Sequence, residues 1–160
     1  MRLFELLDAA GIAHRTLEHQ PVFTVAESEL IRHSMPGLHC KNLFLRPAKG
    51  EHPFCLATLK EDRVVSVNAL ARAAGWPRVS MASAEELRAV LGVEPGSVTP
   101  LSLVNAAPGS VSFVIDAAIA EGDMPLWSHP LRNTASTAIL PGELRRFLEG
   151  LGHQVQVVAL

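Results

Sequence analysis

Residues 42–58 read Asn-Leu-Phe-Leu-Arg-Pro-Ala-Lys-Gly-Glu-His-Pro-Phe-Cys-Leu-Ala-Thr, and this stretch decides the fold. It holds two short apolar runs, 42–45 and 54–58, and turn-forming residues bound both of them. Runs of this length in this setting are typical of buried strands. The segment 48–50 between them ends in glycine and favours a turn. The stretch therefore predicts two buried strands joined as a hairpin.

Outward from this hairpin, helical and strand patterns follow one another along the chain. Leu3, Leu6, Leu7 and Ala10 recur at helical spacing before Gly11, which predicts an N-terminal helix. Capping boxes and helix-ending glycines mark several of the other helices. We expect these helices over 25–34, 68–74, 83–92 and 143–151, and further strands over 12–18, 64–65, 111–115, 134–140 and 154–158.

This interleaving of strands with helices of varied length predicts the fold class. It favours a mixed α/β (α+β) fold with a mixed central sheet flanked by helices. The chain has 160 residues, which fits one compact domain over 1–160. Pro130 lies in the segment 127–133, where it argues against both a helix and a central strand.

Composition restricts the kind of partner. The formal net charge is −2, which argues against a basic stripe gripping a long nucleic acid but leaves room for a short contact with an RNA end. No apolar run approaches the roughly 20 residues that span a bilayer. The N-terminal segment carries acids within its apolar pattern, so it reads as an amphipathic helix and not as a signal peptide. We expect a cytoplasmic monomer with no membrane contact.

The motifs of metal and cofactor chemistry are absent from the sequence. The two cysteines, Cys40 and Cys55, form no Cys-x-x-Cys pair, and the seven histidines form no ligand signature. There is no Gly-x-Gly-x-x-Gly, no phosphate loop, no Gly-x-Ser-x-Gly elbow and no His-Glu-x-x-His. We therefore expect a protein that works without a metal or a cofactor.

A cluster of polar residues stands just ahead of the first apolar run. In a partly desolvated pocket Lys41 could bind a carbonyl or phosphate oxygen, although a surface lysine with a buried stem has the same pattern. Asn42 could donate to the same oxygen or cap the end of the strand. Cys40 adjoins His39 and could be a nucleophile, but sequence neighbours often point apart and a buried, inert thiol is more common.

Two loops are further candidates. The loop 95–100, Pro-Gly-Ser-Val-Thr-Pro, is stiff enough to present backbone N–H groups to an oxyanion or a phosphate, or it is an ordinary connection. The segment 129–133 places His129 in a proline-fixed turn, where it could orient a substrate, relay a proton or simply satisfy the loop.

Four segments together resemble one known family. They are 18–25 (Glu-His-Gln-Pro-Val-Phe-Thr-Val), 35–45 (Met-Pro-Gly-Leu-His-Cys-Lys-Asn-Leu-Phe-Leu), 91–100 (Leu-Gly-Val-Glu-Pro-Gly-Ser-Val-Thr-Pro) and 129–133 (His-Pro-Leu-Arg-Asn). In order and spacing they are similar to the YbaK/ProX superfamily, and more specifically to the free-standing prolyl-tRNA editing proteins of the ProXp-ala type. The resemblance covers essentially the whole chain.

The resemblance implies an activity and a catalytic set. The activity is hydrolysis of the ester that joins alanine to mischarged proline tRNA, without a metal and with a free ribose hydroxyl of the tRNA assisting the attack of water. Lys41 and Asn42 match the family's lysine and adjoining asparagine, Gly96 begins its Gly-x-x-Pro-type loop, and His129 matches the histidine that closes the amino-acid pocket.

The remaining expected contacts follow from the same resemblance. Ser97, Thr99 and Pro100 complete the loop that positions the aminoacyl ester. Val22, Phe23 and Met35 are candidate pocket walls, and Arg32, Arg46 and Lys49 are candidate contacts to the tRNA. The expected partners are the acceptor end of proline tRNA and prolyl-tRNA synthetase.

Two alternatives remain open. The first, within the same superfamily, is removal of cysteine, serine or threonine from tRNA. The second is a non-catalytic module that binds tRNA ends or a synthetase, which would not require all four catalytic matches.

Overall fold

The predicted hairpin forms, and its first strand organises the whole sheet. The computed structural model describes residues 2–21, 29 and 33–160. Its elements are α1 (Arg2–Ala9), β1 (Arg15–Glu18), β2 (Leu38–Pro47), β3 (Phe54–Lys60), α3 (Val67–Ala74), β4 (Val79–Met81), α4 (Ala84–Leu91), the 3-10 helix η1 (Pro100–Asn105), β5 (Val111–Asp116), α5 (Ala117–Ala120), β6 (Leu126–Ser128), β7 (Ala135–Ile139), α6 (Pro141–Gly150) and β8 (Val155–Val158).

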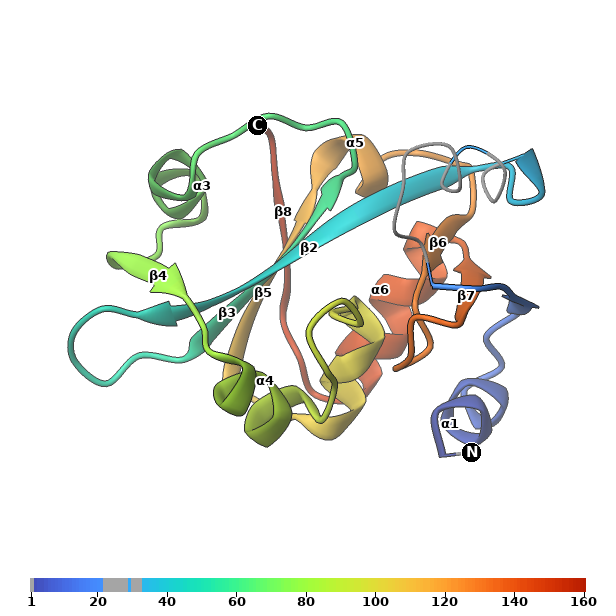
Figure 1. Cartoon of the computed structure of the whole chain (residues 1–160), viewed down its shortest axis with the longest axis horizontal. Coiled ribbons are helices and arrows are strands. Elements are labelled where there is room, and N and C mark those ends of the chain that lie inside the picture. Colours follow the sequence, from blue (N-terminus) through green and yellow to red (C-terminus); the bar gives the residue numbers. More distant parts are fainter. Residues whose placement is uncertain (1, 22–28, 30–32) are drawn as a thin grey trace.

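β2 belongs to two parts of the sheet at once. The strand order is β1-β7-β6-β2-β3-β5-β8, with β4 paired to β2 beside this path. The first two residues of β2, Leu38 and His39, pair in parallel with β6, and residues 40–45 pair antiparallel with β3. Figure 1 shows β2 as the long strand that crosses the molecule between the β4 end and the β6 end. The mixed sheet predicted from the sequence is therefore built around this strand.

The two faces of β2 enter different cores, because successive side chains of a strand point to opposite faces. Cys40 and Phe44 pack in the larger core, which also contains α1, α4, η1 and α6 residues. Leu43 and Leu45 pack in a smaller core beneath α3. A third, small cluster joins Met35 to Trp127.

Most of the predicted elements are confirmed, with capping chemistry as expected. At α4, Ser83 Oγ accepts from the Glu86 backbone N–H (3.1 Å) while the Glu86 carboxylate accepts from the Ser83 N–H (2.9 Å). Gly92 ends this helix in the left-handed region, at φ +67°. Because that region strains residues with a Cβ, the glycine is what allows the chain to leave the helix here.

Some expectations differ from the structure. The strand expected over 64–65 is wrong: this segment connects β3 to α3 without pairing, and Val64 is 96% exposed. The sequence analysis missed β4, α5, η1 and β6, which are all short; β6 overlaps the start of the segment 127–133, in which no strand was expected, and ends two residues before Pro130. The first strand of the hairpin begins at Leu38 and not at Asn42, so Lys41 also lies inside β2 and not ahead of it. Most of the helix expected over 25–34 lies outside the described residues.

Two hydrogen bonds join the start of β2 to the start of β6. The Leu38 N–H donates to the Pro125 carbonyl (2.8 Å), and Trp127 Nε1 donates to the Pro36 carbonyl (3.0 Å). Gly37 lies between these bonds at φ +136°, and a Cβ on it would be 2.5 Å from the Pro125 oxygen. Only glycine fits, since both the backbone angle and the space exclude a side chain.

Among the described residues, no helix is long and apolar enough to cross a membrane.

We expect Gly37→Ala to lower the free energy of unfolding by about 1–3 kcal/mol, because backbone must move away from backbone. Urea unfolding followed by circular dichroism measures the change. Gly142→Ala is the matched control: a Cβ there meets nothing within 4 Å, so helix propensity should leave stability unchanged or slightly raised. Equal stability of Gly37→Ala and the wild type would contradict the close approach at Pro125.

Candidate active site

A small pocket brings together two of the four predicted catalytic residues. Its volume is about 220 Å³, and it lies between β2, the connection from β4 into α4, and the loop after α4. Asn42 and Gly96, which are far apart in the sequence, both line it. The full lining is Asn42, Phe44, Met81, Ala82, Ser83, Ala84, Leu87, Pro95, Gly96 and Val98.

The amide of Asn42 is held by a chain of hydrogen bonds. The fully buried Thr58 hydroxyl donates to Asn42 Oδ1 (2.6 Å), and Asn42 Nδ2 contacts Cys40 Sγ at 3.7 Å. The Cys40 thiol in turn donates to the Trp127 carbonyl, with 3.6 Å between sulfur and oxygen. Since a carbonyl oxygen can only accept, the chain has one direction, from the Thr58 hydroxyl to the Trp127 carbonyl. The amide nitrogen retains a second N–H that can donate to a bound substrate.

Cys40 is a thiol and not a nucleophilic thiolate in this setting. Burial raises the pKa of the Cys40 thiol to about 12, although part of the residue is exposed. The Nε2 of its neighbour His39 donates to the Met35 carbonyl (2.9 Å) and not to Cys40. The two side chains point apart, as alternation along a strand requires. The geometry therefore favours the inert-thiol interpretation of Cys40.

The loop after α4 is fixed at its base and open at its tip. Arg88 Nε donates to both oxygens of Glu94 (2.9 and 2.8 Å), and the Ser97 N–H donates to the Glu94 carbonyl (3.0 Å). Between Glu94 and Ser97, Gly96 has φ +90° and lines the pocket. A glycine here lets a ligand approach the backbone closely, because no side chain covers the N–H groups.

The other predicted residues of this loop are turned into the protein. Ser97 is buried, and the fully buried Thr99 accepts from the Leu101 N–H (3.3 Å), which caps η1. Pro100 occupies the first turn of that helix. Pro95 and Val98 line the pocket in their place.

His129 lies in the loop between β6 and β7, which adjoins the Gly96 loop. Hydrogen bonds fix this loop, and one of its residues has a strained backbone. His129 Nδ1 donates to the Ala135 carbonyl (2.9 Å), which leaves Nε2 as an acceptor, and burial lowers its pKa. The loop is fastened by Arg132, which pairs with both oxygens of Glu18 (2.7 and 2.6 Å). Leu131 has φ +72°, a conformation that costs a side-chain-bearing residue energy.

The two loops adjoin each other, and a histidine that the sequence analysis did not select lies between β1 and His129. A Cβ on Gly96 would lie 3.8 Å from Asn133 Nδ2. The ring of His19 is 6.2 Å from that of His129, and His19 Nε2 bonds the Ser136 hydroxyl (2.8 Å). Pairing of β1 with β7 places His19 here. The residue belongs to the family segment 18–25, to which the sequence analysis assigned no role for a histidine.

Lys41 lies on the opposite face of β2 from Asn42. It shares that face with Leu43 and Leu45, and its ammonium donates to the backbone carbonyl of Arg63, in the loop between β3 and α3. The structure therefore places Lys41 beside the pocket's strand but outside the pocket lining.

An ion pair between partly exposed Arg63 and buried Asp116 lies next to Lys41. The Asp116 side chain is fully buried and accepts from Arg63 Nε (2.9 Å), Arg63 Nη2 (3.1 Å) and the N–H groups of Lys60 and Ala118 (3.1 Å each). Burial alone would raise the pKa of Asp116, but these hydrogen bonds outweigh it and hold the pKa below its ordinary value.

The remaining described residues predicted to contact the substrate or the tRNA lie apart from one another. Met35 is buried with Trp127 and Ala138, away from the Asn42 pocket, and Val22, Phe23 and Arg32 lie outside the described residues. Arg46 shares the face of Asn42 and Phe44 and lies 3.5 Å from Glu86 in α4. Lys49 is in the exposed turn between β2 and β3.

The pocket walls that the sequence analysis missed include Phe44, Ala82 and Leu87. Alternation along β2 could have identified Phe44, since it is two residues beyond Asn42 and shares its face. Ala82 and Leu87 come to the pocket through β4 and α4, so only the tertiary structure reveals them.

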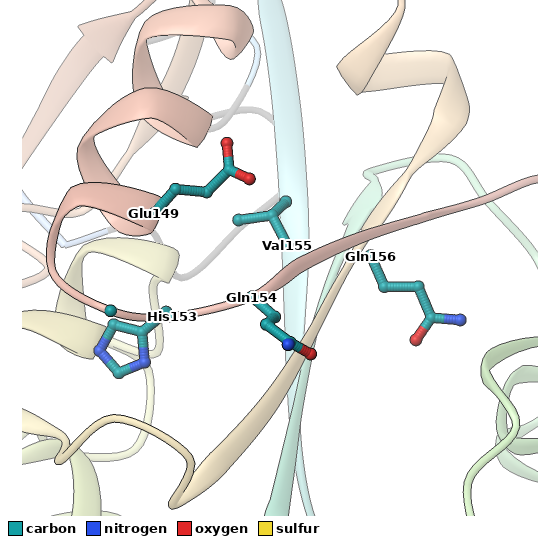
Figure 2. Close-up of a pocket in the computed structure, with 6 residues that line it drawn as sticks. Glu149, His153, Gln154, Val155 and Gln156 are labelled. Carbon is teal, nitrogen blue, oxygen red and sulfur yellow. The ribbon is translucent and has the colours of Figure 1, made fainter.

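A larger hollow of about 600 Å³ lies at the end of α6 but does not form a comparable site. Figure 2 shows its side chains pointing in different directions, with Gln156 directed away from Glu149. His153 Nε2 donates inward to the Leu103 carbonyl (2.8 Å). In the described part of the chain, no group of three or more His, Cys, Asp or Glu could hold a metal ion.

Comparison with known proteins identifies the family. The sequence profile of the aminoacyl-tRNA editing domain matches residues 19–147. The chain is 34% identical to the prolyl-tRNA synthetase associated domain-containing protein 1 of Bos taurus over 154 residues, which cover 94% of this chain and 89% of that one. It is 29% identical to the prolyl-tRNA editing protein ProX of Acetoanaerobium sticklandii, with 96% and 93% covered.

Solved structures share the fold. The crystal structure of the hypothetical protein APE2540 matches with a TM-score of 0.73 at 23% identity, over 98% of both chains. A candidate trans-editing enzyme for prolyl tRNA synthetase matches with a TM-score of 0.72 at 21% identity, over 98% of this chain and 94% of the other.

The chain therefore belongs to the aminoacyl-tRNA editing domain family and is an aminoacyl-tRNA deacylase. It is a member of the YbaK/ProX superfamily and is homologous to ProX, as the sequence motifs predicted.

We expect Asp116→Asn to lower the free energy of unfolding at pH 7 by about 1–3 kcal/mol, the range for hydrogen bonds to a charged group. Because the folded-state pKa of Asp116 is depressed, its stabilisation is present above the ordinary value of 3.8 and is lost as the pH falls below it. The difference between variant and wild type should therefore shrink below about pH 3.8, as urea unfolding across pH would show. A difference independent of pH would contradict the charged state of Asp116.

We expect both cysteines to resist iodoacetamide at pH 8 in the folded protein, since burial raises the pKa of Cys40 and of Cys55 to about 12. Mass spectrometry of the native protein should show no alkylation, and the protein unfolded in urea should be alkylated at both positions. Rapid native alkylation of Cys40 would show a thiolate and reopen its role as a nucleophile.

Proposed function

We propose that this deacylase hydrolyses alanine from mischarged proline tRNA, acting in trans as a single domain over 1–160 in the cytoplasm. The observation that carries the proposal is the small pocket in which Asn42 and the Gly96 loop meet. Its volume, about 220 Å³, is below the 300–1,000 Å³ of ordinary small-molecule pockets, which favours a short aminoacyl group.

The pocket offers hydrogen-bond donors for the ester. The free N–H of Asn42 Nδ2 donates to the ester carbonyl, and its direction is fixed by Thr58 and Cys40. The backbone at Gly96 donates to the same oxygen as negative charge develops on it. Preorganised donors of this kind stabilise the tetrahedral intermediate without having to reorient during the reaction.

The nucleophile is water, assisted by the substrate. A free ribose hydroxyl of the terminal nucleotide takes part in activating the water, whose oxygen attacks the ester carbon. The bond from that carbon to the ribose oxygen then breaks, the ribose oxygen takes up a proton, and alanine and free tRNA leave. Since an aminoacyl ester is already activated, positioning supplies much of the acceleration.

Lys41 and His129 act on the substrate from outside the pocket lining. Lys41 holds oxygens of the terminal nucleotide; it uses one donor on the Arg63 carbonyl and has two more available. His129 presents a neutral Nε2 and closes the amino-acid side of the site.

The tRNA is held by few charges. Arg46 lies on the face of β2 that carries Asn42, Lys49 lies in the adjacent turn, and Arg32 adds a third contact. Binding through so few cations is modest in affinity and sensitive to salt. The names of the relatives favour prolyl-tRNA synthetase as the partner that supplies the mischarged tRNA.

The deciding experiment is deacylation of proline tRNA charged separately with alanine, serine, cysteine and proline. Rapid loss of alanine with proline spared supports the proposal. Faster loss of serine or cysteine, or of threonine from its own tRNA, moves the specificity within the superfamily, because a pocket separates small side chains by only about 1–3 kcal/mol per methylene. No hydrolysis of any of them favours the non-catalytic tRNA-binding module.

We expect Lys41→Ala to reduce kcat/KM for Ala-tRNA(Pro) at least about 100-fold without unfolding the protein, the scale of misplacing a substrate by about 1 Å. Single-turnover deacylation measures it. Arg145→Ala, which removes a cation from the exposed face of α6, is the control and should keep the wild-type rate. A folded, fully active Lys41→Ala variant would remove Lys41 from the mechanism.

We expect Cys40→Ser to retain most deacylation activity, because a hydroxyl both donates to the Trp127 carbonyl and accepts from Asn42. Cys40→Ala leaves Asn42 Nδ2 without that acceptor and should be slower than Cys40→Ser. Loss of turnover in Cys40→Ser, with aminoacyl thioester trapped on the wild-type enzyme, would overturn the water mechanism.

A further inference from the structure

The loop between β3 and α3 carries the carbonyl to which Lys41 donates, and an ion pair fastens that loop. Arg63 supplies both parts: its backbone oxygen accepts from the Lys41 ammonium, and its guanidinium pairs with Asp116. The mechanism above assigns no role to this pair.

The hydrogen bonds of this ion pair fix the position of Arg63. Asp116 is fully buried at the junction of β5 and α5, where both carboxylate oxygens are bound by protein donors. The planar guanidinium donates through Nε and Nη2 to Asp116 and through Nη1 to the Leu160 carbonyl (3.1 Å). A fork that meets three acceptors in fixed directions holds its own backbone more tightly than a single contact would.

We propose that Arg63 and Asp116 are positioning residues for Lys41: they fix the Arg63 carbonyl so that the ammonium is held beside β2. The inference rests on the proposed function, in which Lys41 contacts the substrate. A lysine side chain has a long, flexible stem, so an anchored acceptor removes conformations in which the ammonium faces away.

The inference accounts for a feature of the sequence that is otherwise unexplained. The segment 61–66 forms neither strand nor helix, yet Arg63 is turned inward while Val64 beside it is 96% exposed. Val65 packs against the smaller core, and the side chain of Arg63 supplies the loop's ion pair.

The test uses the full-length protein and three variants. Arg63→Gln removes the ion pair, and Arg63→Lys keeps the charge but cannot reach Asp116 and the Leu160 carbonyl together. Arg146→Gln is the matched control, because Arg146 also joins a carboxylate, Glu143, to backbone carbonyls, those of Ala10 and Gly11, far from Lys41 in the fold.

The first readout needs no tRNA. Acetylation of Lys41 by an N-hydroxysuccinimide ester, followed by peptide mass spectrometry, should be about threefold or more faster in Arg63→Gln than in the wild type, since a side-chain nitrogen released from its acceptor is more accessible to the reagent. Arg146→Gln should be acetylated at the wild-type rate. A folded Arg63→Gln variant with wild-type acetylation of Lys41 would overturn the inference.

The second readout is deacylation of Ala-tRNA(Pro). Arg63→Gln should lower kcat about tenfold with KM changed less than about twofold, because positioning acts on the reacting geometry. In the Lys41→Ala background the same substitution should have no further effect, as expected when one residue acts through the other. Equal losses in both backgrounds would show a merely structural role and overturn the inference.

If Arg63→Gln fails to fold, the same two measurements on Arg63→Lys test the inference. Smaller changes in the same directions support the inference, and wild-type values in both readouts overturn it. A wild-type protein that deacylates no aminoacyl-tRNA would overturn the proposed function, while the acetylation rates would still report whether Arg63 positions Lys41.

Discussion

The structure depends on one strand that must satisfy three neighbours. β2 pairs with β6 at its start, with β3 along its length and with β4 at its end, so every residue from Leu38 to Pro47 has its direction set by backbone hydrogen bonds. With the backbone fixed, strict alternation of side chains leaves no freedom in which face each residue takes. The two cores, the pocket and the position of Lys41 follow from that assignment.

Alternation also separates the two residues that the motif places side by side. Asn42 turns toward the pocket and joins a directed chain of hydrogen bonds, while Lys41 turns toward the loop fixed by Arg63 and Asp116. Each polar side chain is thus oriented by a group from a different part of the chain. An adjacent pair in the sequence serves two separate environments.

The sequence predicted the elements that have local signals. The strands on either side of 48–50, the capping box at Ser83 and the helix ending at Gly92 all follow from short-range chemistry, and the structure confirms them. β4 was missed because three residues give no periodicity, and the strand expected over 64–65 failed because two apolar residues form no strand without a neighbour to pair with. The motif residues Asn42 and Gly96 were found, but the walls Ala82 and Leu87 could not be, since tertiary packing alone brings them to the pocket.

The pairing of β1 with β7 has a consequence for synthesis of the chain. Their contact joins Thr16 to Thr137, whose hydroxyls are 2.7 Å apart although 121 residues separate them. At about 5–20 residues per second, β1 is synthesised roughly 6–24 s before its partner. During that interval it is an unpaired edge, and its charged ends, Arg15 and Glu18, discourage pairing with other chains. β1 therefore joins the sheet only after most of the chain has been synthesised, and its charged ends limit association with other chains until then.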